Sequence, residues 1–136
     1  MFDHMSLGVR DLARATSFYD RVLAPLGMVR VMTFDEPTGT ASAGYDYSGA
    51  ADATDNAAFW LEERKGADIV CPPGFHLCFR AKDRAAVHAF HAAGLAAGGR
   101  DNGAPGLRPA YGPTYYAAFL LDLDGWRIEA VTYRPD

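Results

Sequence analysis

The chain has 136 residues, of which 49% are hydrophobic and 22% are charged, and its formal net charge is -4. This length suits one domain with a substantial core, and the composition argues against a disordered or membrane-embedded protein. The 13 basic residues are outnumbered by 17 acidic ones and form no cluster, which argues against nucleic-acid binding.

The N-terminus and the cysteines indicate the compartment in which the protein is found. The N-terminus lacks the basic and then apolar regions of a signal peptide. The two cysteines, Cys71 and Cys78, have the spacing of neither a redox pair nor a zinc knuckle, so we interpret them as reduced thiols. We therefore expect a cytoplasmic protein.

The first half of the chain predicts a strand, a helix and three further strands. Residues 2–9 alternate between apolar and polar side chains, as a strand with one buried face does. Asp11 is a typical helix N-cap, apolar residues follow it at helical spacing, and Gly27 supplies a stop. Further strands are expected at residues 28–34, 41–47 and 59–61, with a small polar loop at 48–56.

The second half predicts the same order of elements. Residues 76–79 alternate like a strand, and Asp83 is positioned to cap a helix that ends at Gly98-Gly99. Its expected buried stripe consists of Val87, Phe90, Gly94 and Leu95, with His88 and His91 on the solvent side.

The remainder of the second half predicts a loop and a hairpin. The stretch 101–113 is rich in Pro and Gly and is expected to be a loop. Strands are expected at 115–121 and 126–133, joined at Asp124-Gly125, a strong hairpin signal.

The two halves are related by a shift of 72 positions. Strand, helix cap, helix face and stop stay in phase over this shift, which chance does not readily produce. The sequence therefore predicts two copies of one strand–helix–strands module. The identities that support the repeat are His4/His76, Asp11/Asp83, Ala13/Ala85, Phe18/Phe90, Leu23/Leu95, Ala24/Ala96 and Gly27/Gly99.

Two histidines and two glutamates are the strongest candidates for chemistry. His4 and His76 occupy the same place in each repeat, on the face opposite the apolar run of the first strand. Glu62 and Glu129 lie in the last strand of each half, where a lone charge is costly to bury without a partner. A structural, hydrogen-bonding role for the histidines stays open beside metal ligation, which their matching positions in the repeat make a stronger candidate than a lone histidine would be.

At these residues the sequence resembles the vicinal oxygen chelate superfamily, the group of glyoxalases, bleomycin-resistance proteins and extradiol dioxygenases. The resemblance covers nearly the whole chain. It implies an α+β fold of two tandem βαβββ modules, at about 1–64 and 75–136, forming a cup-shaped mixed sheet with helices on the outer face. The stretches that carry the resemblance are Phe2-Asp3-His4, Asp11-Leu12-Ala13-Arg14-Ala15, Phe18-Tyr19 and Asp122-Leu123-Asp124-Gly125 through Glu129.

The resemblance further implies a divalent metal ion held by His4, His76 and Glu129, with Glu62 as a fourth ligand or as a catalytic base beside Glu129. Imidazole and carboxylate ligands suit Zn, Fe, Mn or Ni. The expected activity is that of a metal-dependent lyase, isomerase or dioxygenase acting on a small oxygenated metabolite, in a homodimer. The expected substrate contacts are Trp60, Arg108, Tyr111, Tyr115 and Tyr116, although ordinary core packing is the other interpretation of these aromatic rings.

One loop departs from the pattern of close relatives, which carry histidines in an Arg-Pro-His-Tyr-His-Pro run. Here the equivalent residues are 108–113, and Ala110 and Gly112 stand where those relatives have histidine. This loss leaves metal binding to His4, His76 and Glu129. It also favours the alternative function, a non-catalytic protein of the bleomycin-resistance type that sequesters a small aromatic or cationic compound.

Overall fold

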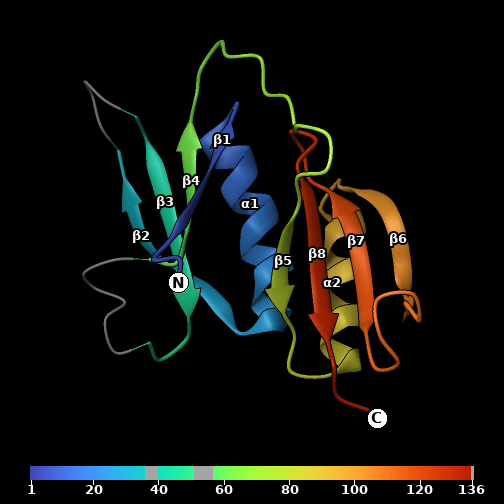
Figure 1. Ribbon diagram of the computed structural model, residues 1–136. Coiled ribbons are helices and arrows are strands. Elements are labelled where there is room, and N and C mark those ends of the chain that lie inside the picture. The colour runs from blue at the N-terminus through green and yellow to red at the C-terminus, as the bar shows by residue number, and fades with distance from the viewer. Residues whose placement is uncertain (36–39, 51–56, 136) are drawn as a thin grey trace.

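The computed structural model describes residues 1–35, 40–50 and 57–135 and consists of two four-stranded mixed sheets, each with its own helix (Figure 1). The first sheet has the order β1 (Met5–Val9), β4 (Phe59–Glu63), β3 (Ser42–Tyr47) and β2 (Met28–Phe34). The second has the order β5 (Leu77–Arg80), β8 (Arg127–Thr132), β7 (Tyr116–Leu121) and β6 (Arg100–Leu107). The helices are α1 (Leu12–Leu23), a short 3₁₀ turn η1 (Ala24–Leu26) and α2 (Arg84–Ala96).

The first and last strands of each module are parallel neighbours. β1 pairs with β4, and β5 pairs with β8, while the remaining pairs are antiparallel. A parallel pair needs a long crossover, which the helix and the two middle strands supply. This topology confirms the predicted pair of βαβββ modules, and it places the residues that begin β5 beside those of β8.

The helix starts agree with the sequence prediction at atomic detail. The Asp11 carboxylate accepts a hydrogen bond from the backbone N–H of Arg14 at 2.9 Å, and Asp83 does the same for Ala86 at 2.8 Å. Each bond satisfies one of the free N–H groups of a first helical turn. The first helical segment stops at Gly27, whose φ of 81° is left-handed and favours glycine.

Aromatic side chains join the two modules in one core. The Tyr19 ring of α1 lies 5.2 Å from the Phe59 ring of β4, and Phe59 lies 5.4 Å from Phe79 of β5. The buried Tyr19 hydroxyl donates a hydrogen bond to Asp122, at the turn between β7 and β8, at 2.7 Å. These contacts fix the first helix against the second module.

The expected loop at 101–113 is wrong in its first half, because β6 runs through this stretch as far as Leu107. β6 is an edge strand, and its register with β7 shifts on both sides of Gly103. An edge strand with bulges tolerates Gly and Pro, including Pro105, which cannot donate a ladder hydrogen bond. The Gly and Pro content of this stretch therefore led to the prediction of a loop where the structure has β6.

The face of α2 is also rotated from the expected one. Leu95 is 43% exposed, whereas His91 is 9% exposed. The reason is the close approach of Gly94 to β7, where a Cβ atom on Gly94 would lie 2.2 Å from Leu120 Cδ1. Gly94 is thus the point at which α2 touches β7. Leu95 is the next residue, about 100° further around the helix, and its side chain is turned toward solvent.

His91 ties α2 to β6 through Asp101, with 2.8 Å between His91 Nε2 and Asp101 Oδ1. This hydrogen bond and the backbone N–H of Gly103 lower the pKa of Asp101 below its ordinary value. A lowered folded-state pKa means that the carboxylate stabilises the fold above the unfolded-state pKa and stops doing so as the pH falls through the folded-state value. We expect the difference in unfolding free energy between wild type and Asp101→Asn to shrink as the pH falls below about 4, the ordinary range of an aspartate, in urea titrations. A difference that grows toward acid pH contradicts this assignment.

Part of the expected polar loop at 48–56, namely residues 51–56, lies outside the described residues. In the described part of the chain, no helix is both long and apolar enough to cross a membrane.

Candidate metal centre

The face of the second sheet that points away from α2 carries the candidate site. Cys78 of β5 pairs with Glu129 of β8, and Glu129 pairs with Phe119 of β7. Cross-strand partners project to the same side of a sheet, so these three side chains form a row across the sheet. Their intervening neighbours, such as Ile128 and Leu120, are buried in the core on the other face.

Glu129 is the centre of this row and is only 1% exposed. Its Oε1 accepts a hydrogen bond from the Tyr115 hydroxyl at 2.6 Å, and its Oε2 lies 3.1 Å from Nε2 of His76. A buried carboxylate is tolerated when such partners compensate for the lost water. The sheet therefore brings an imidazole, a carboxylate and a phenol together from three positions distant in sequence.

The Cys78 thiol and the Tyr115 hydroxyl, which lie beside Glu129, remain protonated at neutral pH. Burial and the neighbouring Glu129 raise the pKa of the Cys78 thiol to about 12, although much of the Cys78 residue is exposed. Burial and the hydrogen bond to Glu129 likewise raise the pKa of Tyr115. A carboxylate disfavours a second negative charge beside it, so both groups act as hydrogen-bond donors.

His4 lies apart from this cluster. It precedes β1 in the first module, its side chain is 48% exposed, and its Nδ1 lies 2.6 Å from Asp3 Oδ1. Among the residues that the structure describes, no three His, Cys, Asp or Glu side chains are close enough to hold a metal ion. The structure thus brings His76 and Glu129 together and does not bring His4 to them within one chain.

Glu62 lies on the first sheet, opposite Gly8 of β1. It forms an ion pair with Arg64, which also donates a hydrogen bond to the Thr40 hydroxyl at 3.0 Å. The Glu62 side chain is 33% exposed. Its charge is therefore compensated, and it does not join Glu129 in this chain.

Trp60 forms a flat aromatic surface on the same sheet. Its ring is stacked on Phe34, with centroids 6.0 Å apart and an interplanar angle of 19°. Gly44 of β3 makes room for it, because a Cβ atom there would lie 3.0 Å from the indole ring. The stack is a suitable platform for a planar ligand.

The tyrosines of the second module divide between the two faces of the sheet. The rings of Tyr111 and Tyr115 lie 5.4 Å apart, and Tyr115 lies 5.3 Å from Tyr133. Tyr116 faces α2 instead, with its hydroxyl 2.7 Å from His88 Nε2 and its ring 4.5 Å from the Arg84 guanidinium. Tyr116 is therefore held against the helix, on the side opposite Glu129.

Arg108 begins the loop 108–113, in which Ala110 and Gly112 stand where close relatives have histidines. Its guanidinium donates a hydrogen bond to the carbonyl of Ala104 at 2.6 Å and lies 5.4 Å from the centre of the Phe119 ring. Phe119 belongs to the Glu129 row, so Arg108 lies over the same face of the sheet. The methyl group of Ala110 and the hydrogen of Gly112 offer no metal ligand.

Three residues near the site were not predicted from the sequence: Cys78, Arg80 and Tyr133. Cys78 and Arg80 follow His76 at steps of two along a strand, so the alternation places them on the face of His76. The Arg80 guanidinium lies 4.9 Å from the centre of the Tyr133 ring. The two-residue alternation of a strand could therefore have identified Cys78 and Arg80 from the sequence.

Comparisons with known proteins agree with the two-module fold. The family model of the Glyoxalase/Bleomycin resistance protein/Dioxygenase superfamily matches residues 1–130. Comparison with curated protein sequences gives no match. A glyoxalase/bleomycin resistance protein from Albidiferax ferrireducens is similar, with 31% identity, a TM-score of 0.72 and 99% of each chain covered.

Two further solved structures share the fold. Glyoxalase I from Zea mays has 24% identity and a TM-score of 0.74, over 96% of this chain and 45% of that chain. A point mutant of FosX, a fosfomycin resistance protein from Listeria monocytogenes, was solved with Mn(II) and 1S,2S-dihydroxypropylphosphonic acid; it has 14% identity and a TM-score of 0.68, over 96% of this chain and 90% of that chain. The chain belongs to the glyoxalase/bleomycin resistance protein/dioxygenase superfamily.

Proposed function

We propose that the protein is a metal-dependent enzyme in which His76 and Glu129 hold a divalent ion and that it acts, as a lyase, isomerase or dioxygenase, on a small oxygenated metabolite. The observation that carries the proposal is the 3.1 Å approach of His76 Nε2 to Glu129 Oε2 on an almost fully buried carboxylate. Burying a carboxylate in a strand is unfavourable unless a partner compensates for its charge, and a bound cation would provide that compensation.

The residues fit such an ion. One imidazole and one carboxylate suit Zn, Fe, Mn or Ni, and the FosX relative was solved with Mn(II). A bound divalent ion supplies Lewis acidity toward substrate oxygens. Tyr115 donates its hydroxyl proton to Oε1 of Glu129, which leaves Oε2 directed at His76. The Tyr115 oxygen can still accept a hydrogen bond from a substrate hydroxyl.

The missing ligand comes, in this proposal, from a second copy of the chain in a homodimer. His4 belongs to the first module, whereas His76 and Glu129 belong to the second, and the described part of one chain does not assemble the three. A twofold dimer in which the first module of one chain packs against the second module of the other would form two such sites, one at each end of the interface. Glu62 then enters the same site as a fourth ligand or as the base that removes a proton from the substrate.

Mixing two defective variants tests the shared site. We expect neither His4→Ala nor His76→Ala to bind Mn(II) tightly, and we expect a refolded equimolar mixture to regain roughly a quarter of wild-type capacity, as random pairing in a twofold dimer gives. The measurement is free Mn(II) by electron paramagnetic resonance, with light scattering to establish the dimer. A mixture that binds no more than its components contradicts a site shared between chains.

A binding protein that needs no metal is the second candidate, and the stack of Trp60 on Phe34 favours it. A planar ligand gains stacking energy on such a platform. If this is the function, Trp60→Ala abolishes binding of a planar aromatic probe, while His76→Ala and chelators leave it unchanged. Loss of probe binding on chelation excludes this candidate.

A further inference from the structure

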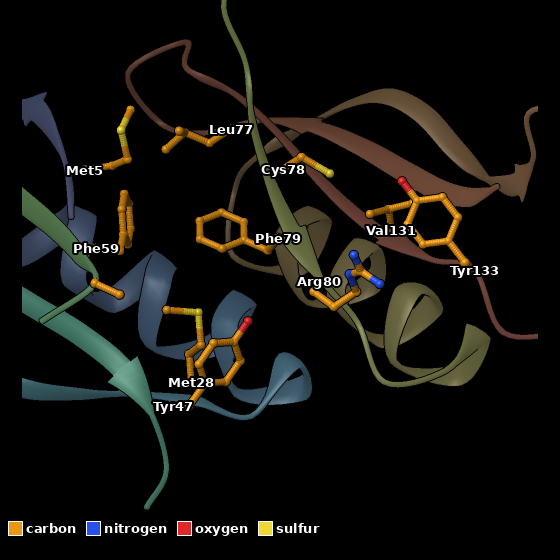
Figure 2. A pocket seen from close by; sticks show the side chains of 11 residues that line it. Met5, Met28, Tyr47, Phe59, Leu77, Cys78, Phe79, Arg80, Val131 and Tyr133 are labelled. Atoms are coloured by element: carbon orange, nitrogen blue, oxygen red, sulfur yellow. The ribbon is translucent and has the colours of Figure 1, made fainter. Parts of the chain in front are cut away.

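A cavity of about 480 Å³ lies where the two modules meet, beside β5. Its size falls within the range of about 300–1,000 Å³ that is typical of small-molecule sites. One wall comes from the first module, through Met5, Met28 and Phe59, and the other from Leu77 and Phe79 of β5 (Figure 2). The cavity adjoins the candidate metal centre through Cys78 and Tyr133, but His76, Glu129 and Tyr115 do not line it, so its ligand need not contact the residues proposed to hold the metal.

The interior of the cavity is apolar and adaptable. Two methionines line it, and methionine adjusts to ligands of different shape because its side chain is unbranched and flexible. Figure 2 shows Phe79 pointing from β5 toward Met5 and Phe59, while Arg80 points toward Tyr133. The body of a ligand in this space must therefore be hydrophobic.

Among the described residues that line the cavity, Arg80 is the single cation. Its guanidinium lies over the Tyr133 ring, at 4.9 Å from the centroid. Within the described part of the chain, no acidic side chain forms an ion pair with it. Tyr133 orients the guanidinium but does not neutralise it, and its planar donors match a carboxylate.

We infer that this cavity binds a small carboxylic acid with an apolar body, which enters between Met5, Met28 and Phe79 while its carboxylate pairs with Arg80. A neutral apolar molecule would leave Arg80 without a partner, and a cationic one would be repelled by it. A polar sugar or nucleotide would leave its own groups unsatisfied against the methionine and phenylalanine side chains.

Methionine labelling provides a direct test, with octanoate as the probe. The chain has four methionines, of which Met5 and Met28 line the cavity, while Met1 and Met32 do not. We expect octanoate, added with EDTA present, to shift the ¹³C-methyl signals of Met5 and Met28 saturably and to leave those of Met1 and Met32 in place. Because EDTA is present, this result does not depend on the metal centre, and the two proposals fail separately.

Charge variants then locate the carboxylate. We expect Arg80→Gln to weaken octanoate binding about tenfold or more, the usual effect of losing a charged hydrogen bond. Lys82→Gln removes the same charge two residues away on an exposed side chain and is expected to change binding less than about twofold. Octanol is expected to bind wild type and Arg80→Gln equally.

Three results overturn the inference. In the first, octanoate leaves the Met5 and Met28 signals unchanged. In the second, Arg80→Gln and Lys82→Gln weaken binding equally, which shows that only general electrostatic attraction is at work. In the third, the two methyl signals shift on dilution of the protein and not on addition of octanoate, which assigns the cavity to a contact between copies of the chain.

Discussion

Replacing Glu129 by glutamine is expected to remove high-affinity binding of divalent metal while leaving the protein folded. The glutamine amide has the shape of the glutamate side chain. Its oxygen can still accept the hydrogen bond that the Tyr115 hydroxyl donates to Oε1 of Glu129, at 2.6 Å in the wild-type protein. The amide has no negative charge, however, and an amide oxygen is a far weaker ligand for Zn, Mn or Fe than a carboxylate. We also expect little loss of stability, because the isosteric amide still fills the buried position and keeps the Tyr115 hydrogen bond.

Tyr115→Phe is the matched control for this change. This change removes only the hydrogen bond that Tyr115 donates to Glu129. Loss of a hydrogen bond to a metal-ligating side chain typically weakens metal affinity by roughly 10–100-fold. We expect Glu129→Gln to lose more than this in Mn(II) titrations followed by calorimetry. Equal affinities of wild type and Glu129→Gln, with the circular dichroism unchanged, contradict the assignment of Glu129 as a ligand.

The Asp122→Ala protein is expected to lose about 3 kcal/mol or more of unfolding free energy, because several hydrogen bonds to a buried carboxylate disappear together. Asp122 is 4% exposed; it accepts a hydrogen bond from the Tyr19 hydroxyl at 2.7 Å and others from the backbone N–H groups of Asp124 and Trp126. Alanine leaves the buried Tyr19 hydroxyl without an acceptor. The turn that connects β7 to β8 also loses the two bonds from its backbone N–H groups to the Asp122 side chain, while its backbone–backbone bonds remain.

Asp122→Asn separates the loss of hydrogen bonds from the loss of charge. The amide oxygen still accepts from the two backbone N–H groups, and its NH₂ group donates to the Tyr19 oxygen. Burial raises the pKa of Asp122, so the carboxylate itself is unfavourable there, and we expect Asn to cost less than half of what Ala costs. Urea unfolding at pH 7 measures all three proteins, and an unchanged midpoint for Asp122→Ala contradicts this role.

Most of the fold follows from patterns that are local in sequence. The caps Asp11 and Asp83, the stop at Gly27 and the strand alternation all depend on neighbouring residues, and the structure agrees with each. β6 was missed because its Gly and Pro residues resemble a loop, and an edge strand tolerates them. The repeat contained the missing signal, since a shift of 72 carries Met28, where β2 begins, to Arg100, where β6 begins.

The candidate site was less accessible to sequence reasoning, because its contacts join distant segments. The repeat identified His76 and Glu129, but the hydrogen bond of Tyr115 to Glu129 depends on where the chain enters β7, which no local pattern specifies. Adjacent residues of an extended chain point to opposite sides, and here Tyr115 contacts Glu129 while Tyr116 contacts His88 of α2. The position of His4, away from the other two ligands, depends on how two modules and two chains pack.

The central claim is that this chain holds a divalent metal ion through His76 and Glu129, and the metal content of the protein tests it most directly. Wild type and His76→Ala are each incubated with Zn, Mn, Ni or, without oxygen, Fe(II), then desalted and measured by elemental analysis. The account predicts about one ion per wild-type chain and loss of that ion in the variant. A folded wild-type protein that retains none of the four metals contradicts it.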